Sequence, residues 1–160
     1  MIISEHFTLH QLADGIYAAI ATESGAGFSN AGLIDLGGQV LIFDSFENPQ
    51  AAEDLLKACR QITGQDPAAV IISHWHPDHW GGLQVFAGSG ILATPETRQA
   101  MLPIAQEMLA DKANPAHLES ELKDTKARLA KEKNTNPRKA LEISIARQRQ
   151  QGLGQTGHGD

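Results

Sequence analysis

Three histidines and one aspartate lie within residues 74–79, which read His-Trp-His-Pro-Asp-His. His74 and His76 are two positions apart, so in an extended segment both side chains point the same way and can bind one ion. Asp78 and His79 are adjacent, and they fit a loop that turns into a helix, where they can face a second ion or an activated water. Imidazole and carboxylate ligands suit Zn²⁺ best among the common ions. The spacing therefore predicts a metal site; the alternative is a solvent-exposed, His-rich loop that binds no ion.

The element that must position these ligands is the segment directly ahead of them. Residues 68–72 read Ala-Ala-Val-Ile-Ile, an apolar run with the length of a buried strand. A strand that ends in a ligand-rich loop is how α/β folds place chemistry at the carboxyl ends of their strands. Trp75 and Trp80 flank the ligands, and they either shield the site, line a substrate mouth or pack into the core.

Further strands and helices are indicated around this segment. Apolar runs predict strands at residues 15–20, 32–36, 40–43 and 91–93, and a short helix is predicted at 83–86. The Gly-Gly pair at 37–38 is a favoured two-residue turn and predicts a hairpin. The first long helix is predicted at 49–63, with Asn48 as its N-cap, Pro49 at its first position and Gly64 at its end. Such an alternation of strands and helices is typical of an α/β fold.

The chain is expected to have three parts: residues 1–95, a helical segment 96–151, and a flexible, Gly-rich tail 152–160. Helices are predicted to begin at or near Pro95, Pro115 and Pro137. In the second of them, side chains follow one another at spacings of four, three and four: Leu118, Leu122, Thr125 and Leu129. This seam is typical of a packing face rather than a cofactor site.

Taken together, these motifs resemble the metallo-β-lactamase fold hydrolases. The His-x-His-x-Asp-His run, followed by Gly81-Gly82, is similar to the signature loop of that family. Residues 29–37 resemble its early strand, and residues 40–45 resemble its next strand, which ends in the family's buried acid at Asp44. The resemblance covers roughly residues 12–100. It implies an α/β fold of the αβ/βα type, in which residues 1–95 are the N-terminal β-sheet half with flanking helices and the later helices form an insertion or hairpin.

The resemblance also implies roles for individual residues. His74 and His76 would bind a first zinc ion, and Asp78 and His79 a second, each completed by ligands from later in the chain. Asp44 would orient a ligating histidine from behind, whereas the alternative is a strand-end acid that caps a loop.

The activity that follows from the resemblance is hydrolysis of a small-molecule substrate. A metal-bound hydroxide, available near neutral pH, would attack an ester, thioester, lactam or related bond, while Asp78 also orients or deprotonates the water. One or two Zn²⁺ ions are expected. Histidine and carboxylate ligands also accept iron or manganese, which leaves an oxygen-using di-iron enzyme as a further alternative.

The later part of the sequence departs from the family pattern. After Leu92 we find no further strands and no bridging aspartate, and the later histidines are His117, in a predicted helix, and His158, in the predicted tail. The alternative to a hydrolase is therefore a truncated, catalytically incomplete metal-binding fragment whose helices mediate oligomerisation. The remaining ligands would come from a second chain or from a missing C-terminal half, so we expect a homo-oligomer or such a missing half.

Composition excludes several classes of protein. The chain has 160 residues, of which 41% are hydrophobic and 20% charged, with a net charge of −6. Such values favour one ordinary soluble domain and argue against a nucleic-acid-binding protein. The single cysteine, Cys59, excludes an internal disulfide and is expected to be a small buried side chain. No apolar run has the roughly 18–20 residues of a membrane span, and the first residues lack a basic n-region. A cytoplasmic location is expected, or a periplasmic one if a leader was removed.

Overall fold

A computed structural model describes residues 4–23, 25, 27–112, 115–131, 142 and 145 of the chain. The chain divides into two compact units, Met1–Leu102 and Pro103–Asp160. None of the described helices combines the length and the apolar character that crossing a membrane requires.

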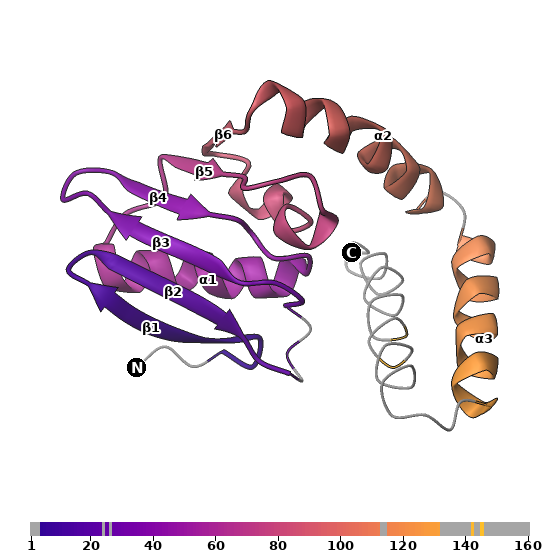
Figure 1. Cartoon of the computed structure of the whole chain (residues 1–160). Coiled ribbons are helices and arrows are strands. Elements are labelled where there is room, and N and C mark those ends of the chain that lie inside the picture. Colours follow the sequence, from indigo (N-terminus) through magenta and orange to yellow (C-terminus); the bar gives the residue numbers. More distant parts are fainter. Residues whose placement is uncertain are drawn as a thin grey trace, which may run out of the picture. The chain divides into compact units, whose positions relative to one another are not determined.

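The first unit is built on one mixed β-sheet of six strands, which follow one another in chain order (Figure 1). The strands are β1 (Phe7–Ala13), β2 (Ile16–Ala21), β3 (Ala31–Asp35), β4 (Val40–Phe43), β5 (Ala69–Ile71) and β6 (Gly90–Leu92). Strands β1 to β4 pair antiparallel, whereas β4, β5 and β6 pair parallel. This confirms the predicted α/β class and its N-terminal, sheet-containing half.

Helix α1 (Pro49–Thr63) makes the connection that the parallel pair β4–β5 needs. The side chain of Asn48 accepts a hydrogen bond of 2.9 Å from the backbone N–H of Gln50, as an N-cap does. Gly64 ends the helix in the left-handed conformation, with φ 70°, and its N–H bonds to the carbonyl of Arg60. Both predicted ends are confirmed, because these capping signals lie within a few residues of the helix.

The core lies between the sheet and α1, which crosses one face of the sheet (Figure 1). Leu33, Ile42 and Val70 lie opposite one another across β3, β4 and β5, and all three are fully buried. The helix contributes a matching row of small and apolar buried residues: Ala51, Ala52, Leu55, Ala58 and Cys59. Burial of these two rows against each other holds the β4–α1–β5 unit together.

The opposite face of the sheet is also apolar, yet it is partly open. Ile16 and Ile20 of β2 are each 42% exposed, and Phe43 of β4 is 41% exposed. Because side chains alternate along a strand, these residues point away from the row that packs on α1. The first unit therefore leaves one side of its sheet without a full covering layer among the residues that the structure describes.

One strand differs from the sequence-based expectation. No pattern indicated β1, whereas the structure pairs it antiparallel with β2, from Phe7 opposite Ala21 onward. Its residues include His10 and Gln11, so it lacks a continuous apolar signal, and the register shifts between Gln11 and Ala13. This edge strand forms because it pairs with β2, and not because its residues have a strong intrinsic preference for strands.

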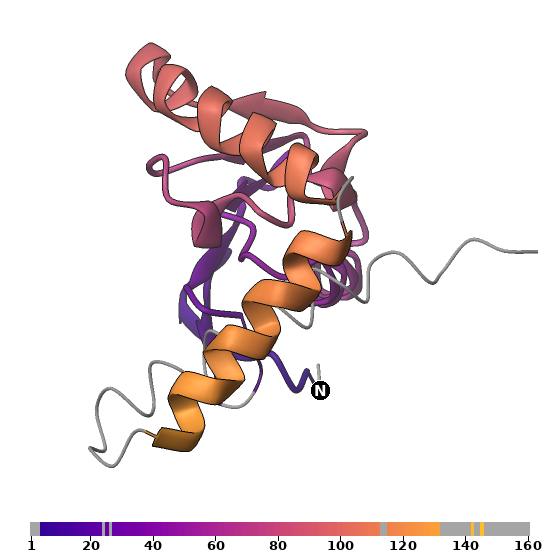
Figure 2. The ribbon, with the colours of Figure 1, turned by 90° about the vertical axis from the view of Figure 1, so that its right-hand side faces the viewer.

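The helices after β6 begin where the prolines predicted. Helix α2 (Pro95–Lys112) starts in the first unit, and α3 (Pro115–Lys131) is one continuous helix in the second (Figure 2). Among the described side chains of α3, Leu122, Thr125 and Leu129 are the least exposed, as expected for a packing seam. The predicted helix from Pro137 lies outside the described residues except at 142 and 145, and the predicted tail 152–160 lies wholly outside them.

Candidate metal centre

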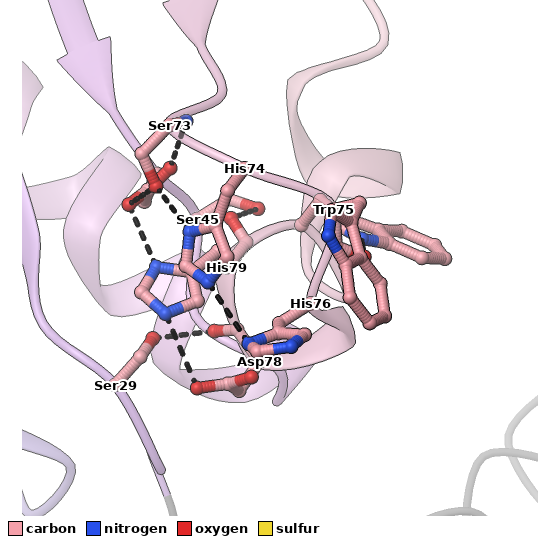
Figure 3. Close-up of polar contacts among 10 residues, drawn as sticks. Ser29, Ser45, Ser73, His74, Trp75, His76, Asp78 and His79 are labelled. Atoms are coloured by element: carbon pink, nitrogen blue, oxygen red, sulfur yellow. Dashed lines mark hydrogen bonds and ion pairs between the residues drawn. The ribbon is translucent and has the colours of Figure 1, made fainter. Parts of the chain in front are cut away.

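The loop after β5 carries all four predicted ligands (Figure 3). It leaves the sheet at Ile72, whose N–H bonds to the carbonyl of Leu92, and then tightens into the short 3₁₀ turn η1 (Pro77–His79). Pro77 stands at the first position of that turn, where its missing N–H costs nothing. The turn folds the chain back, so that His79 returns towards the start of the loop.

His74 and His76 face each other. Their Nε2 and Nδ1 atoms are 3.0 Å apart, as expected for side chains two positions apart in an extended segment. Two nitrogens bound to one tetrahedral zinc at about 2.0–2.1 Å would lie about 3.3 Å apart. The pair therefore has nearly the spacing that a shared ion requires.

Asp78 and His79 form a second pair beside the first. The Nε2 atom of His79 lies 3.3 Å from Oδ2 of Asp78, and both side chains are about a quarter exposed. The ring centroids of His74 and His79 are 4.1 Å apart, so the two pairs adjoin. Three imidazoles and one carboxylate thus gather in a single loop, a donor set whose chemistry fits Zn²⁺.

Asp44 lies behind this cluster, directly after β4, and is 3% exposed. Its Oδ2 atom accepts a hydrogen bond of 2.7 Å from Nδ1 of His79. Its backbone adopts φ 58°, which is uncommon for a residue with a side chain. Strained backbone of this kind persists where surrounding contacts hold it, and it gathers at functional sites. The acid contacts a predicted ligand, which is the position that an orienting group requires.

Sequence reasoning missed two serines that hold the loop. Ser73 donates from its hydroxyl to Oδ2 of Asp44 at 2.7 Å and from its backbone N–H to Oδ1 at 2.8 Å. The hydroxyl of Ser29 donates to the backbone carbonyl of Asp78. No spacing rule identifies such residues, because they meet the loop only through folding; the position of Ser73 between a strand and a predicted ligand was the single available clue.

The glycines after the ligands allow close backbone approach. A Cβ atom added to Gly81 would lie 2.5 Å from the carbonyl oxygen of Glu47, and one added to Gly82 would lie 2.3 Å from that of Ser45. Real side chains do not tolerate such distances, so the loop can pack on the β4–α1 connection only with glycine at both positions. The Gly-Gly pair therefore positions the ligands rather than contacting them.

The two tryptophans differ in surroundings. Trp80 is buried, and its ring N–H donates to the carbonyl of Trp75 at 2.8 Å, so it packs the loop. Trp75 is 44% exposed, and its ring centroid lies 4.2 Å from that of His76. In Figure 3 its ring stands beside that of His76, and its exposed part can meet a bound molecule.

Other histidines and the single cysteine do not belong to the ligand loop. The side chain of His6 is nearly buried and its Nδ1 atom bonds to the carbonyl of Gly25, which gives it a structural role. His117 lies in α3, and His158 lies outside the described residues. Cys59 is buried, as predicted, and desolvation raises the pKa of its thiol.

The four side chains do not close a full ligand shell by themselves. Among the residues that the structure describes, no three His, Cys, Asp or Glu side chains are arranged so that they could hold one ion together. The predicted ligands therefore come as two pairs, and a catalytic zinc usually needs three protein ligands.

An open groove of about 690 Å³ leads to this cluster. Its walls are mainly apolar residues of β1 to β4, among them Leu12, Ile16 and Phe43. Asp44, Ser73, Asp78 and His79 also line it. The partly open face of the sheet and two of the four predicted ligands, Asp78 and His79, thus share one surface.

Comparison with known proteins agrees with this architecture. The model of the metallo-beta-lactamase superfamily matches residues 24–138. A solved metallo beta lactamase from Erythrobacter litoralis, with beta mercaptoethanol in its active site, is similar with a TM-score of 0.55 and 19% identity. A second, from Hirschia baltica, has a TM-score of 0.54 and 17% identity. The matches cover 64% and 62% of this chain but 47% and 48% of those proteins, so the chain spans about half the length of the solved structures that it matches.

Proposed function

Because the chain belongs to the metallo-β-lactamase superfamily, we propose that it is part of a metal-dependent hydrolase, with Zn²⁺ as the ion that its ligands favour. The observation that carries the proposal is the meeting of His74 with His76 and of Asp78 with His79, at 3.0 Å and 3.3 Å, in adjoining pairs. Unpaired nitrogen and carboxylate lone pairs that face each other at such distances repel, unless a proton or a cation lies between them.

Each residue of the cluster has a role in this proposal. His74 and His76 hold one ion, and Asp78 and His79 hold a second. Bound zinc would lower the pKa of a coordinated water to about 7 and polarise the bond to be cleaved. Asp78, about a quarter exposed, also accepts the proton of the attacking water, while the buried Asp44 orients His79.

The groove supports the substrate class. It reaches the cluster along apolar walls, and such sites take ligands with an apolar body and one polar reacting group. An ester, thioester or lactam offers that combination, with a carbonyl at the ligands and an apolar part along the sheet.

The same face supports a covering layer. Among the described residues, the sheet has an exposed apolar surface and the ligand shell beside it is incomplete. Further polypeptide that covers the sheet and completes the shell would explain both features. That polypeptide is either a second copy of this chain or a further segment of a longer protein.

Metal content tests the proposal. The native chain, collected from a size-exclusion column, is analysed for zinc per chain together with His76→Ala and His10→Ala. His10 is an exposed histidine of β1 outside the cluster, so it controls for loss of an imidazole. We expect close to two zinc ions per chain, unchanged in His10→Ala and clearly reduced in His76→Ala. Equal zinc content in all three proteins would overturn the proposal.

The pairwise arrangement of the ligands favours one alternative, a metal-binding module that does not hydrolyse by itself. Assays with ester, thioester and lactam substrates on the zinc-loaded protein separate the two. Turnover that His76→Ala abolishes supports the hydrolase, whereas bound zinc without turnover supports the module.

A further inference from the structure

A single buried carboxylate contacts one histidine of each pair, either directly or through one hydroxyl. The Oδ2 atom of Asp44 accepts from Nδ1 of His79 at 2.7 Å and from the hydroxyl of Ser73 at 2.7 Å. The same hydroxyl lies 2.9 Å from Nδ1 of His74. In Figure 3 dashed lines mark these contacts between Ser73, the carboxylate and the two imidazoles.

The direction of each hydrogen bond follows from what the groups can donate. A carboxylate only accepts, so the proton of the His79 contact lies on Nδ1. The hydroxyl proton of Ser73 is used on Asp44, so its oxygen accepts from Nδ1 of His74. Both imidazoles therefore carry a proton on Nδ1, which makes Nε2 the nitrogen through which each could bind a metal ion.

These Nε2 atoms are the ones that face the other predicted ligands. Nε2 of His74 lies 3.0 Å from His76, and Nε2 of His79 lies 3.3 Å from Asp78. Which ring nitrogen of a histidine can bind a metal is set by the hydrogen bond that the other makes. We propose that Asp44 sets the tautomer of both ligands, of His79 directly and of His74 through Ser73, which makes Ser73 a positioning residue that couples the two ligand pairs.

The surroundings hold this arrangement in place. Asp44 is 3% exposed, so water competes little for its oxygens. Its second oxygen accepts from the backbone N–H of Ser73 at 2.8 Å, and its own N–H donates to the carbonyl of Ile71 at 2.9 Å. A carboxylate that accepts three hydrogen bonds, two from Ser73 and one from His79, leaves the histidine protons little freedom.

Because of this arrangement, the tautomer of His74 depends on the Ser73 hydroxyl, whereas that of His79 does not. Loss of the Ser73 hydroxyl removes the only bridge from Asp44 to His74 in the part of the chain described, yet it leaves the direct bond to His79. A merely structural serine would instead affect both histidines alike or neither.

Nitrogen NMR of the imidazoles tests this inference in the metal-free protein, at a pH above the range in which histidines titrate. The variants are Ser73→Ala, Ser73→Thr, which keeps a hydroxyl, and Ser89→Ala as control. Ser89 donates to the carbonyl of Pro67 at 2.6 Å and touches no predicted ligand. We expect the Nδ1–H tautomer for both histidines in the wild type, loss of that preference at His74 alone in Ser73→Ala, and no change in the other two.

Zinc affinity gives a second readout. We expect Ser73→Ala to bind zinc about 10–100-fold more weakly, as is usual for loss of such a partner, and Ser73→Thr to recover most of that loss. An unchanged His74 tautomer in a folded Ser73→Ala protein would overturn the inference.

This inference rests on the proposed function only in taking the two histidines as ligands. If the tautomers shift as expected but the wild type binds no zinc, the hydrogen-bond relay stands and the proposed function fails.

Discussion

At the scale of single residues, the candidate site consists of two layers. The outer layer is the pair His74–His76 and the pair Asp78–His79, whose donor atoms face each other. The inner layer is Asp44, which accepts three hydrogen bonds from Ser73 and His79. Chemistry in the outer layer depends on orientation by the inner one, because an imidazole binds a metal only through an unprotonated nitrogen.

Replacing Asp44 by Asn should weaken metal binding at both pairs. The amide can donate to Nδ1 of His79, which would move the imidazole proton to Nε2 and block its lone pair. We expect a 10–100-fold loss of zinc affinity, roughly the usual effect of removing such a partner, measured by titration calorimetry. Asp66→Asn, at an exposed carboxylate that pairs with Arg60, is the matched control and should bind like the wild type. Equal affinity of the two variants would contradict the role of Asp44.

Cys59 should make the free energy of unfolding decrease at alkaline pH. Burial raises the pKa of its thiol above the ordinary value of 9.0, so the folded state prefers the neutral form. Its contribution is fully present below that ordinary value and is lost as pH rises through the folded-state pKa. Urea unfolding at neutral pH and at about pH 10 should show a larger loss of stability for the wild type than for Cys59→Ala. The same loss in both proteins would assign the pH dependence to other groups.

At the scale of elements, the ligand loop is held by its neighbours in the sheet. Helix α1 joins β4 to β5 and brings the ends of these parallel strands to one edge, where Asp44 and the loop meet. The backbone N–H of Ser45 donates to the carbonyl of His79 at 2.8 Å, and that of Gly82 donates to Phe46 at 3.0 Å. The loop is therefore held by backbone hydrogen bonds to the β4–α1 connection as well as by its side chains.

Replacing Gly82 by Ala should displace the loop. The added Cβ would lie 2.3 Å from the carbonyl oxygen of Ser45 and 2.5 Å from the Cβ of Ala52, and backbone cannot yield as a side chain does. We expect a loss of about 1–3 kcal/mol in the free energy of unfolding, together with reduced zinc content. Gly88→Ala is the control, since a Cβ there meets nothing within 4 Å. Urea denaturation of the two variants checks the difference, and equal stability would show that the loop has room.

At the scale of the whole molecule, the main feature is the apolar face opposite α1. Ile16, Ile20 and Phe43 are exposed there by about two fifths of their surface. Apolar surface beside the predicted ligands favours coverage by another polypeptide layer. The chain also spans about half the length of the solved structures that it matches.

Replacing Phe43 by Ser should reduce self-association if a second copy supplies that layer. Phe43 lines the groove, and its removal takes apolar surface out of the contact. Light scattering over a range of protein concentrations should show a higher dissociation constant for Phe43→Ser than for Leu36→Ser. Leu36 is 62% exposed but does not line the groove. A monomeric wild type at all concentrations would contradict pairing of two copies and favour further residues as the cover.

Local patterns were enough to predict much of this protein. The helix Pro49–Thr63, the hairpin between β3 and β4, the α/β class and the family all follow from caps, turns, apolar runs and the ligand motif, which act over a few residues. The common direction of His74 and His76 has the same local origin.

Only folding decided the rest. The strand β1, the bridge from Asp44 through Ser73 to His74, and the contact of Ser29 with the ligand loop join residues far apart in sequence or lacking any local signal. Glycine is needed at positions 81 and 82 because the backbone of Glu47 and Ser45 lies close against them, which only the folded structure shows. Such contacts depend on which segments the sheet brings together, and the spacing of residues along the chain does not predict this.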